Sequence, residues 1–144
     1  MKAVFADTFY WAALTSTEDS SHVRALAFSR SAQLDGIVTT DEVLVEYLAF
    51  FASARPSVRM QAGNTVAQFL AHSRVQVIPQ TRDSFLRGLQ LYRARPDKGY
   101  SLTDCISMET MRREGLTEVL TNDRHFAGSG HNAAMLYANV LHPR

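Results

Sequence analysis

The sequence predicts an α/β fold in which a central parallel sheet carries helices on both faces. Short apolar segments typical of buried strands recur along the chain, and segments with helical spacing of apolar residues separate them. Strands that are joined through helices run parallel, because each connection returns the chain to the same end of the sheet. The 144 residues, 46% of them hydrophobic, suit one domain over residues 1–144 with a substantial core.

The strands are predicted from short apolar runs that turn or capping residues and prolines delimit. The last candidate is the least well delimited, because the segment FAGSGHN before it reads as a loop. The sheet is therefore expected to have four or five strands. The four expected strands are residues 3–6, 37–38, 75–78 and 118–121, and residues 134–141 are the candidate fifth.

The first half of the chain is expected to hold four helices. Asp7-Thr8 ends the first strand and is positioned to cap a helix over residues 9–14. Helical spacing then runs over residues 21–34, until Asp35-Gly36 breaks it before the second strand. The next two helices follow from a T-x-x-E capping box, Thr39 with Glu42, and from Pro56, which ends one helix and begins another.

The second half is expected to hold two helices. One covers residues 83–93, and the stretch RPDKG at residues 95–99 then forms a loop. Residues 101–113 form the other helix, in which Ser101 and Asp104 match an S-x-x-D capping pattern. Gly115 is expected to end this helix.

Composition narrows the compartment and the partners. The longest apolar runs fall far short of the roughly 20 residues that a membrane span needs, and the N-terminus lacks a secretory cleavage pattern. The single cysteine, Cys105, cannot form an internal disulfide and is expected to be a small buried residue. We therefore expect a cytoplasmic protein with no membrane contact. The basic residues are nearly all arginine, which suits phosphate recognition, although a GC-rich genome explains the bias equally well.

Four acidic residues are expected near one end of the sheet. Asp7 and Asp123 follow the first and fourth strands, and ligands of open parallel sheets bind beyond these carboxyl ends. Asp104 lies in the first turn of a helix, and Glu46 lies one turn inside another. Each aspartate also has a structural explanation as a cap or turn residue, while Glu46 stands four residues after Glu42, a spacing at which like charges oppose helix formation.

Clustered carboxylates need a counter-charge. Two carboxylates about 4 Å apart repel each other by several kcal/mol at an effective dielectric constant of about 20. Oxygen ligands without a set of cysteines or histidines suit hard Mg²⁺ or Mn²⁺ ions. Such an ion activates water and stabilises charge during phosphoryl transfer. The constellation therefore predicts metal-dependent phosphodiester chemistry.

Four segments, VFADTFYW, VLVEYL, DKGYSLTDCIS and VLTNDRHF, resemble the PIN-domain family in their order and spacing, and within it the VapC-type toxins. The resemblance covers nearly the whole chain, and its third and fourth segments are the most specific. It implies a three-layer α/β/α fold, Mg²⁺ or Mn²⁺ dependence, and endonucleolytic cleavage of structured RNA such as tRNA or ribosomal RNA. It also implies a cognate antitoxin and a homodimer.

The resemblance carries roles to individual positions. The acidic quartet falls on Asp7, Glu46, Asp104 and Asp123, the residues that the physical argument selects. Two further polar positions, Thr8 and Ser107, match family residues that hold metal-bound water or hydrogen-bond the metal ligands. An ordinary structural role, as a cap or helix hydroxyl, explains each of them equally well. Three basic side chains next to the acidic positions are candidates for contacts with RNA phosphates. These side chains are Lys98, Arg124 and His125, and a structural role is the alternative for each.

Three features of the sequence allow more than one interpretation. Relatives usually continue after HF to a Gly-Phe pair, whereas here AGSGHNAAML follows Phe126, which puts the packing of the last strand in doubt. A non-catalytic PIN-fold module for RNA binding or assembly is the alternative function. An aromatic stripe beside Asp7 is either an antitoxin-docking groove or part of the core or a dimer interface; it consists of Phe9, Tyr10, Trp11 and Leu14.

Overall fold

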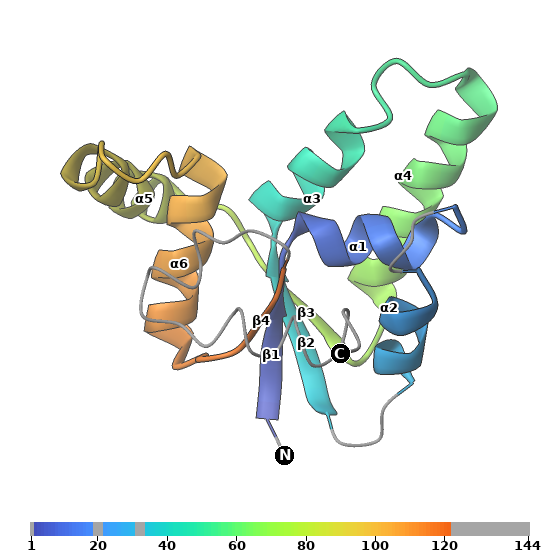
Figure 1. Ribbon diagram of the computed structural model, residues 1–144, viewed down its shortest axis with the longest axis horizontal. Helices are drawn as coiled ribbons and strands as arrows, with labels where there is room; N and C mark the ends of the chain where they lie inside the picture. Colours follow the sequence, from blue (N-terminus) through green and yellow to red (C-terminus); the bar gives the residue numbers. More distant parts are fainter. Residues whose placement is uncertain (1, 19–21, 31–33, 122–144) are drawn as a thin grey trace.

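The computed structural model describes residues 2–18, 22–30 and 34–121, and it confirms the predicted α/β fold with a parallel sheet (Figure 1). The strands are β1 (Lys2–Ala6), β2 (Leu34–Thr40), β3 (Val75–Ile78) and β4 (Val119–Leu120). The helices are α1 (Thr8–Thr15), α2 (His22–Ser29), α3 (Asp41–Ala49), α4 (Pro56–Ala71), α5 (Arg82–Ala94) and α6 (Leu102–Glu114).

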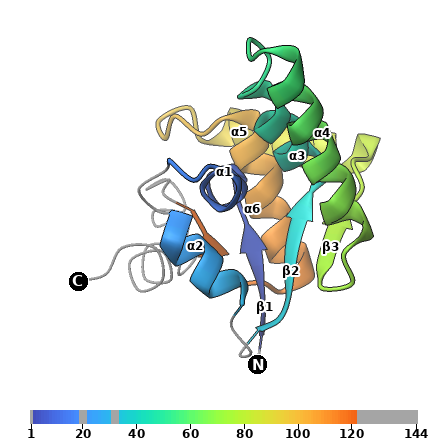
Figure 2. The ribbon, with the colours of Figure 1, turned by 90° about the vertical axis from the view of Figure 1, so that its right-hand side faces the viewer.

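The four described strands lie in the order β3-β2-β1-β4, and all neighbouring pairs are parallel. Helices α5 and α6 lie on one side of the sheet, and α1, α2 and α4 lie on the other, which gives the expected three layers (Figure 1). Figure 2 shows β1 and β2 running in the same direction. The carboxyl ends of the strands therefore meet at one edge, where α1 follows β1 and α3 follows β2.

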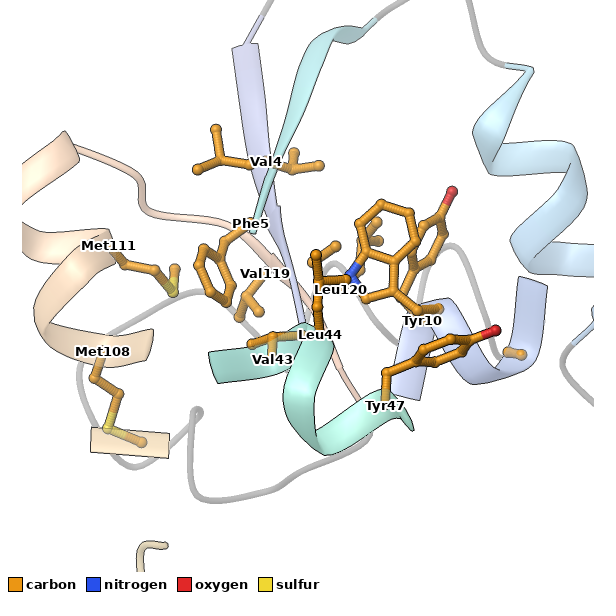
Figure 3. Close-up of a cluster of buried hydrophobic side chains, with 14 of the residues drawn as sticks. Val4, Phe5, Tyr10, Val43, Leu44, Tyr47, Met108, Met111, Val119 and Leu120 are labelled. Carbon is orange, nitrogen blue, oxygen red and sulfur yellow. The ribbon is translucent and has the colours of Figure 1, made fainter. Parts of the chain in front are cut away.

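The core fills the space between the sheet and both helical layers (Figure 3). Phe5 on the central strand faces Met111 of α6, while Tyr10 and Tyr47 cover the other side. Burial of side chains of this size contributes roughly 1.5–3 kcal/mol each. The buried indole of Trp11 also donates a hydrogen bond to the Thr39 hydroxyl oxygen at 3.2 Å, so the polar atom of the largest core side chain is satisfied.

Local capping signals in the second half of the chain are confirmed. The Ser101 hydroxyl accepts a hydrogen bond from the Asp104 backbone amide, and the Asp104 carboxylate accepts one from the Ser101 amide. Gly115 ends α6 in the left-handed conformation, with φ at 70°. In the first half, Pro56 begins α4 as predicted, where its missing N–H costs no helical hydrogen bond. It does not end the preceding helix, because α3 ends at Ala49.

The capping box predicted for Thr39 and Glu42 is wrong. The N-cap of α3 is Thr40, whose side chain accepts from the Val43 backbone amide at 3.1 Å. Thr39 belongs to β2 instead, and its buried hydroxyl donates to the Ala6 carbonyl oxygen at 2.9 Å. Sheet pairing therefore extends through Thr40, two residues beyond the predicted end of the strand, and the helix cap lies one residue later than the sequence pattern indicates.

The helix predicted over residues 21–34 is also too long, because α2 ends at Ser29 and residue 34 begins β2. The Asp35-Gly36 pair, predicted to form a turn between this helix and the second strand, lies inside the strand. A Cβ at Gly36 would stand 3.1 Å from the Arg74 carbonyl oxygen. Glycine here permits the close approach of the segment before β3, where the Ile37 amide donates to the same oxygen at 2.8 Å.

Two further expectations concern the ends and the surroundings of the fold. The candidate fifth strand, residues 134–141, lies outside the described residues. Cys105 is fully buried as expected, and burial raises the pKa of its thiol to about 11, which keeps it protonated. No helix in the described part of the chain is long and apolar enough to cross a membrane.

Two helical glycines give opposite predictions for stability. At Gly88 a Cβ would overlap Ile106 Cγ1 and lie 3.3 Å from the Ile106 backbone, because α5 and α6 pack closely there. Gly88→Ala should therefore lower the free energy of unfolding by about 1–3 kcal/mol. Gly63→Ala is the matched control, because no atom lies within 4 Å of the added methyl group, and it should raise stability by about 0.5–1 kcal/mol. Urea unfolding of both variants tests the packing, and equal effects would contradict it.

Candidate functional site

Three of the four predicted carboxylates line one pocket at the carboxyl end of the sheet. The pocket has a volume of about 720 Å³. Asp7 reaches it from the end of β1, Glu46 from α3, and Asp104 from the first turn of α6. Its other lining residues are Thr8, Phe9, Ala12, Ser16, Phe50, Phe51 and Ser101.

Asp7 is the most deeply buried of the three carboxylates. It is 6% exposed and occupies the N-cap position of α1, where the Thr8 amide acts on its carboxylate but no side-chain capping hydrogen bond is formed, so capping does not account for this buried carboxylate. The Thr121 hydroxyl donates to Asp7 Oδ2 at 2.7 Å, whereas Oδ1 is buried without a hydrogen-bond partner among the described residues. An acceptor oxygen in this state costs free energy until a cation or a proton reaches it.

Burial raises the pKa of Asp7 from 3.8 to about 7. The negative charges of Asp104 and Glu46 add to this effect, and the hydrogen bonds from the Thr121 side chain and the Thr8 backbone oppose it. The charges of Asp104 and Glu46 therefore lie close enough to Asp7 to affect its ionisation. Near neutral pH, about half of the Asp7 side chains therefore carry a proton in the absence of a cation.

Glu46 and Asp104 are each held by a nearby polar group. The buried Thr8 hydroxyl donates to Glu46 Oε1 at 2.6 Å. Asp104 is 8% exposed and accepts from the Ser101 amide at 3.0 Å, so its predicted capping role is real. Capping and a place in the pocket are compatible, since a carboxylate offers about four lone-pair sites.

The remaining candidate residues lie elsewhere or outside the described chain. Asp123, Arg124 and His125 all fall outside the described residues. Lys98 is half-buried in the loop before α6, and Ser107 is fully buried on α6; neither lines the acidic pocket. The Ser107 hydroxyl has no hydrogen-bond partner among the described residues.

Thr121 is a site residue that the sequence did not reveal. It follows β4 directly and is 2% exposed. Because β4 pairs with β1, the Thr121 side chain reaches the carboxylate that follows β1. The expected adjacency of the first and fourth strands, which places Asp123 near Asp7, is also the signal that could have placed Thr121 there.

The aromatic stripe on α1 belongs largely to the core. Tyr10 and Trp11 are at most 1% exposed, which rules out these two rings as a ready docking surface. Their rings contact each other with centroids 5.1 Å apart, and the Trp11 ring also stacks on Phe69 of α4. Phe9 and Leu14 are half-buried and line pockets.

The donor set is suited to a hard divalent cation. Carboxylate oxygens are the ligands that Mg²⁺ and Mn²⁺ prefer, and the buried Asp7 Oδ1 is an acceptor that still needs a partner. Within the described ranges, no group of three or more His, Cys, Asp or Glu side chains is close enough to hold a metal ion. The fourth predicted carboxylate, Asp123, lies beyond these ranges. Asp7, Glu46 and Asp104 therefore match a metal site in the chemistry of their donor atoms, but the described residues alone do not form one.

The chain belongs to the PIN domain family, which its sequence matches over residues 4–130. Its fold is similar to that of VapC20 from Mycobacterium tuberculosis, described as a toxin that cleaves the sarcin-ricin loop. That likeness has a TM-score of 0.78 at 24% identity and covers 89% of this chain and 95% of the other.

A second similar structure is VapBC2 from Rickettsia felis, which was solved bound to a DNA fragment from its promoter. Here the TM-score is 0.62 at 18% identity, with 89% of this chain and 92% of the other covered. At these identities the likeness establishes the fold. No curated protein matches the sequence.

The raised pKa of Asp7 predicts how stability depends on pH in metal-free protein. Because the folded state holds its proton up to about pH 7 and the unfolded state only to about 3.8, the folded state binds more protons between these values. The resulting stability is complete below about pH 4 and is lost as pH rises through 7, by an amount on the order of 4 kcal/mol.

The Asp7→Asn variant removes this titration and keeps an oxygen that accepts from Thr121. The difference in unfolding free energy between wild type and Asp7→Asn, measured in EDTA from pH 4 to pH 8, should shift in favour of the variant as pH rises. A constant difference over this range would show that Asp7 titrates normally.

Proposed function

We propose that the protein is a Mg²⁺- or Mn²⁺-dependent endoribonuclease that acts as the toxin of a toxin-antitoxin pair. The observation that carries the proposal is the acidic pocket, in which Asp7, Glu46 and Asp104 converge in a chain of the PIN domain family. The fold that it shares with a toxin described as cleaving the sarcin-ricin loop supports RNA as the substrate class.

The proposed roles follow from the contacts of each residue. Asp7, Glu46 and Asp104, together with Asp123, hold the cation. A bound divalent cation supplies Lewis-acid chemistry, which makes water a better nucleophile and stabilises charge on the phosphate. Thr8 positions the Glu46 carboxylate through its 2.6 Å hydrogen bond. Ser107 is proposed to hold a water molecule on the evidence of its hydroxyl, which is buried on α6 without a partner among the described residues, rather than of any contact with the pocket.

The pKa of Asp7 makes cation binding depend on pH. Its side chain must lose its proton to bind a cation, and burial holds the pKa of this carboxyl at about 7. Cation binding near neutral pH therefore releases a fraction of a proton from this group. Activity is expected to rise with pH through 7, because the ionised fraction of Asp7 rises there.

The proposed partners follow from the same comparison. A cognate antitoxin is supported by the similarity in fold between this chain and a chain of the VapBC2 structure. A homodimer and a cytoplasmic location are proposed together with it. Lys98, Arg124 and His125 are proposed to contact RNA phosphates, whose attraction to basic side chains weakens as salt rises.

Cleavage of a total small-RNA pool by the purified protein tests the proposal. Wild type with Mg²⁺ or Mn²⁺ should cleave, and EDTA should abolish cleavage. Asp104→Asn should lose at least a hundredfold in rate, on the order of 3 kcal/mol of transition-state stabilisation, while its amide oxygen still accepts from the Ser101 backbone and preserves the cap of α6.

A matched control separates catalysis from helix capping. Asp83 also lies in the first turn of a helix but is exposed, paired with Arg87 and outside the pocket, so Asp83→Asn should cleave as wild type does. Equal inactivity of wild type and Asp104→Asn, with equal RNA binding, would instead favour a non-catalytic RNA-binding module.

A further inference from the structure

One aromatic side chain in the acidic pocket lacks the burial that its neighbours have. Phe50 lines the pocket and is 66% exposed. Phe51, the next residue, is half-buried and packs its ring against Tyr47 with centroids 5.2 Å apart. Packing therefore explains Phe51 but does not explain a large apolar ring left in solvent at position 50.

Phe50 and Glu46 lie on the same face of one helix. Phe50 directly follows α3 and keeps right-handed helical dihedrals, with φ at −60° and ψ at −25°. Residues four apart on a helix have Cβ atoms about 5–6 Å from each other. The pocket wall formed by α3 thus presents a carboxylate and, one turn further on, an exposed aromatic ring.

A nucleotide has the complementary arrangement. Its phosphate carries the charge that a cation held by the carboxylates would attract, and its base lies several Å away with an apolar face. Proteins that bind single-stranded RNA stack unpaired bases on exposed aromatic rings. We propose that Phe50 is a stacking platform for an unpaired nucleobase next to the phosphate bound at the acidic pocket; this inference rests on the proposed function.

The charge of the pocket gives this platform a physical purpose. Three carboxylates repel an RNA backbone, and a cation offsets only part of that repulsion. Stacking is insensitive to the sign of the backbone charge and contributes affinity at the point where phosphate contacts are least favourable. It also selects single-stranded or looped RNA, because a base inside a duplex cannot reach the ring.

Binding of defined RNA probes tests the platform without requiring catalysis. The background is Asp104→Asn with Mg²⁺, and the probes are a fluorescent oligoadenylate and an abasic ribose-phosphate oligomer of equal length. In fluorescence anisotropy, Phe50→Ala should weaken binding of the oligoadenylate about tenfold and leave the abasic oligomer unchanged. Phe50→Trp should retain binding, and Phe50→Leu, which keeps an apolar side chain but no ring, should behave as Phe50→Ala.

Tyr92→Ala is the matched control, because Tyr92 is an aromatic residue of α5 that is 49% exposed and does not line the pocket. It should bind both probes as the background protein does. The stacking role would be overturned if Phe50→Ala weakened binding of the two probes equally or did not weaken binding of either. It would also be overturned if Phe50→Ala weakened only the binding of a protein partner. If wild type cleaves RNA while Phe50→Ala binds normally, the stacking role of Phe50 is wrong and the proposed nuclease function is retained. If binding depends on the bases but wild type does not cleave, the stacking role is retained and the proposed nuclease function is wrong.

Discussion

The position of β1 between two parallel neighbours governs the candidate site. Because β2 and β4 flank it, the residue that follows β1 emerges inside the layered structure rather than at its edge. Asp7 occupies this place, with its backbone amide bound to the Leu120 carbonyl at 3.1 Å. Its carboxyl therefore lies in a region of low dielectric, where the described groups that oppose the cost of its charge are Thr121 and a backbone amide.

The other two carboxylates are carried by helices that begin at the same edge of the sheet. Asp104 lies in the first turn of α6, where the positive end of the helix dipole favours its charge and the Ser101 amide binds it. Glu46 is held by Thr8, the residue next to Asp7 in the chain. The hydrogen bonds that order the helices and the first strand thus also set the positions of the acids.

The sequence predicted those features of the fold that depend on neighbouring residues. The cap formed by Ser101 with Asp104, the start of α4 at Pro56 and the end of α6 at Gly115 agree with the prediction. Each of these signals acts within one helical turn. The prediction for Thr39 was wrong because its hydroxyl bonds Ala6, a partner 33 residues away in sequence, and no local pattern reports that pairing. Gly36 was misinterpreted for the same reason, since the Arg74 carbonyl that it accommodates comes from a distant segment.

The site shows the same division between local and distant contacts. Strand and helix ends were enough to bring Asp7, Glu46 and Asp104 to one edge of the sheet. They did not reveal Thr121, whose bond to Asp7 joins residues 114 apart. Nor did they show that Tyr10 and Trp11 would be buried while Phe50 stays exposed, because burial depends on how the helices pack against one another and against the sheet.

The proposed site depends on Asp7 being a buried acid whose negative charge a bound cation balances. Carbon-13 NMR titration of the Asp7 carboxyl group, with and without Mg²⁺, measures this directly. We expect a pKa of about 7 in metal-free protein and a large downward shift of this pKa when Mg²⁺ binds, because the cation favours the ionised form. A pKa near the ordinary value of 3.8 in both conditions would contradict it.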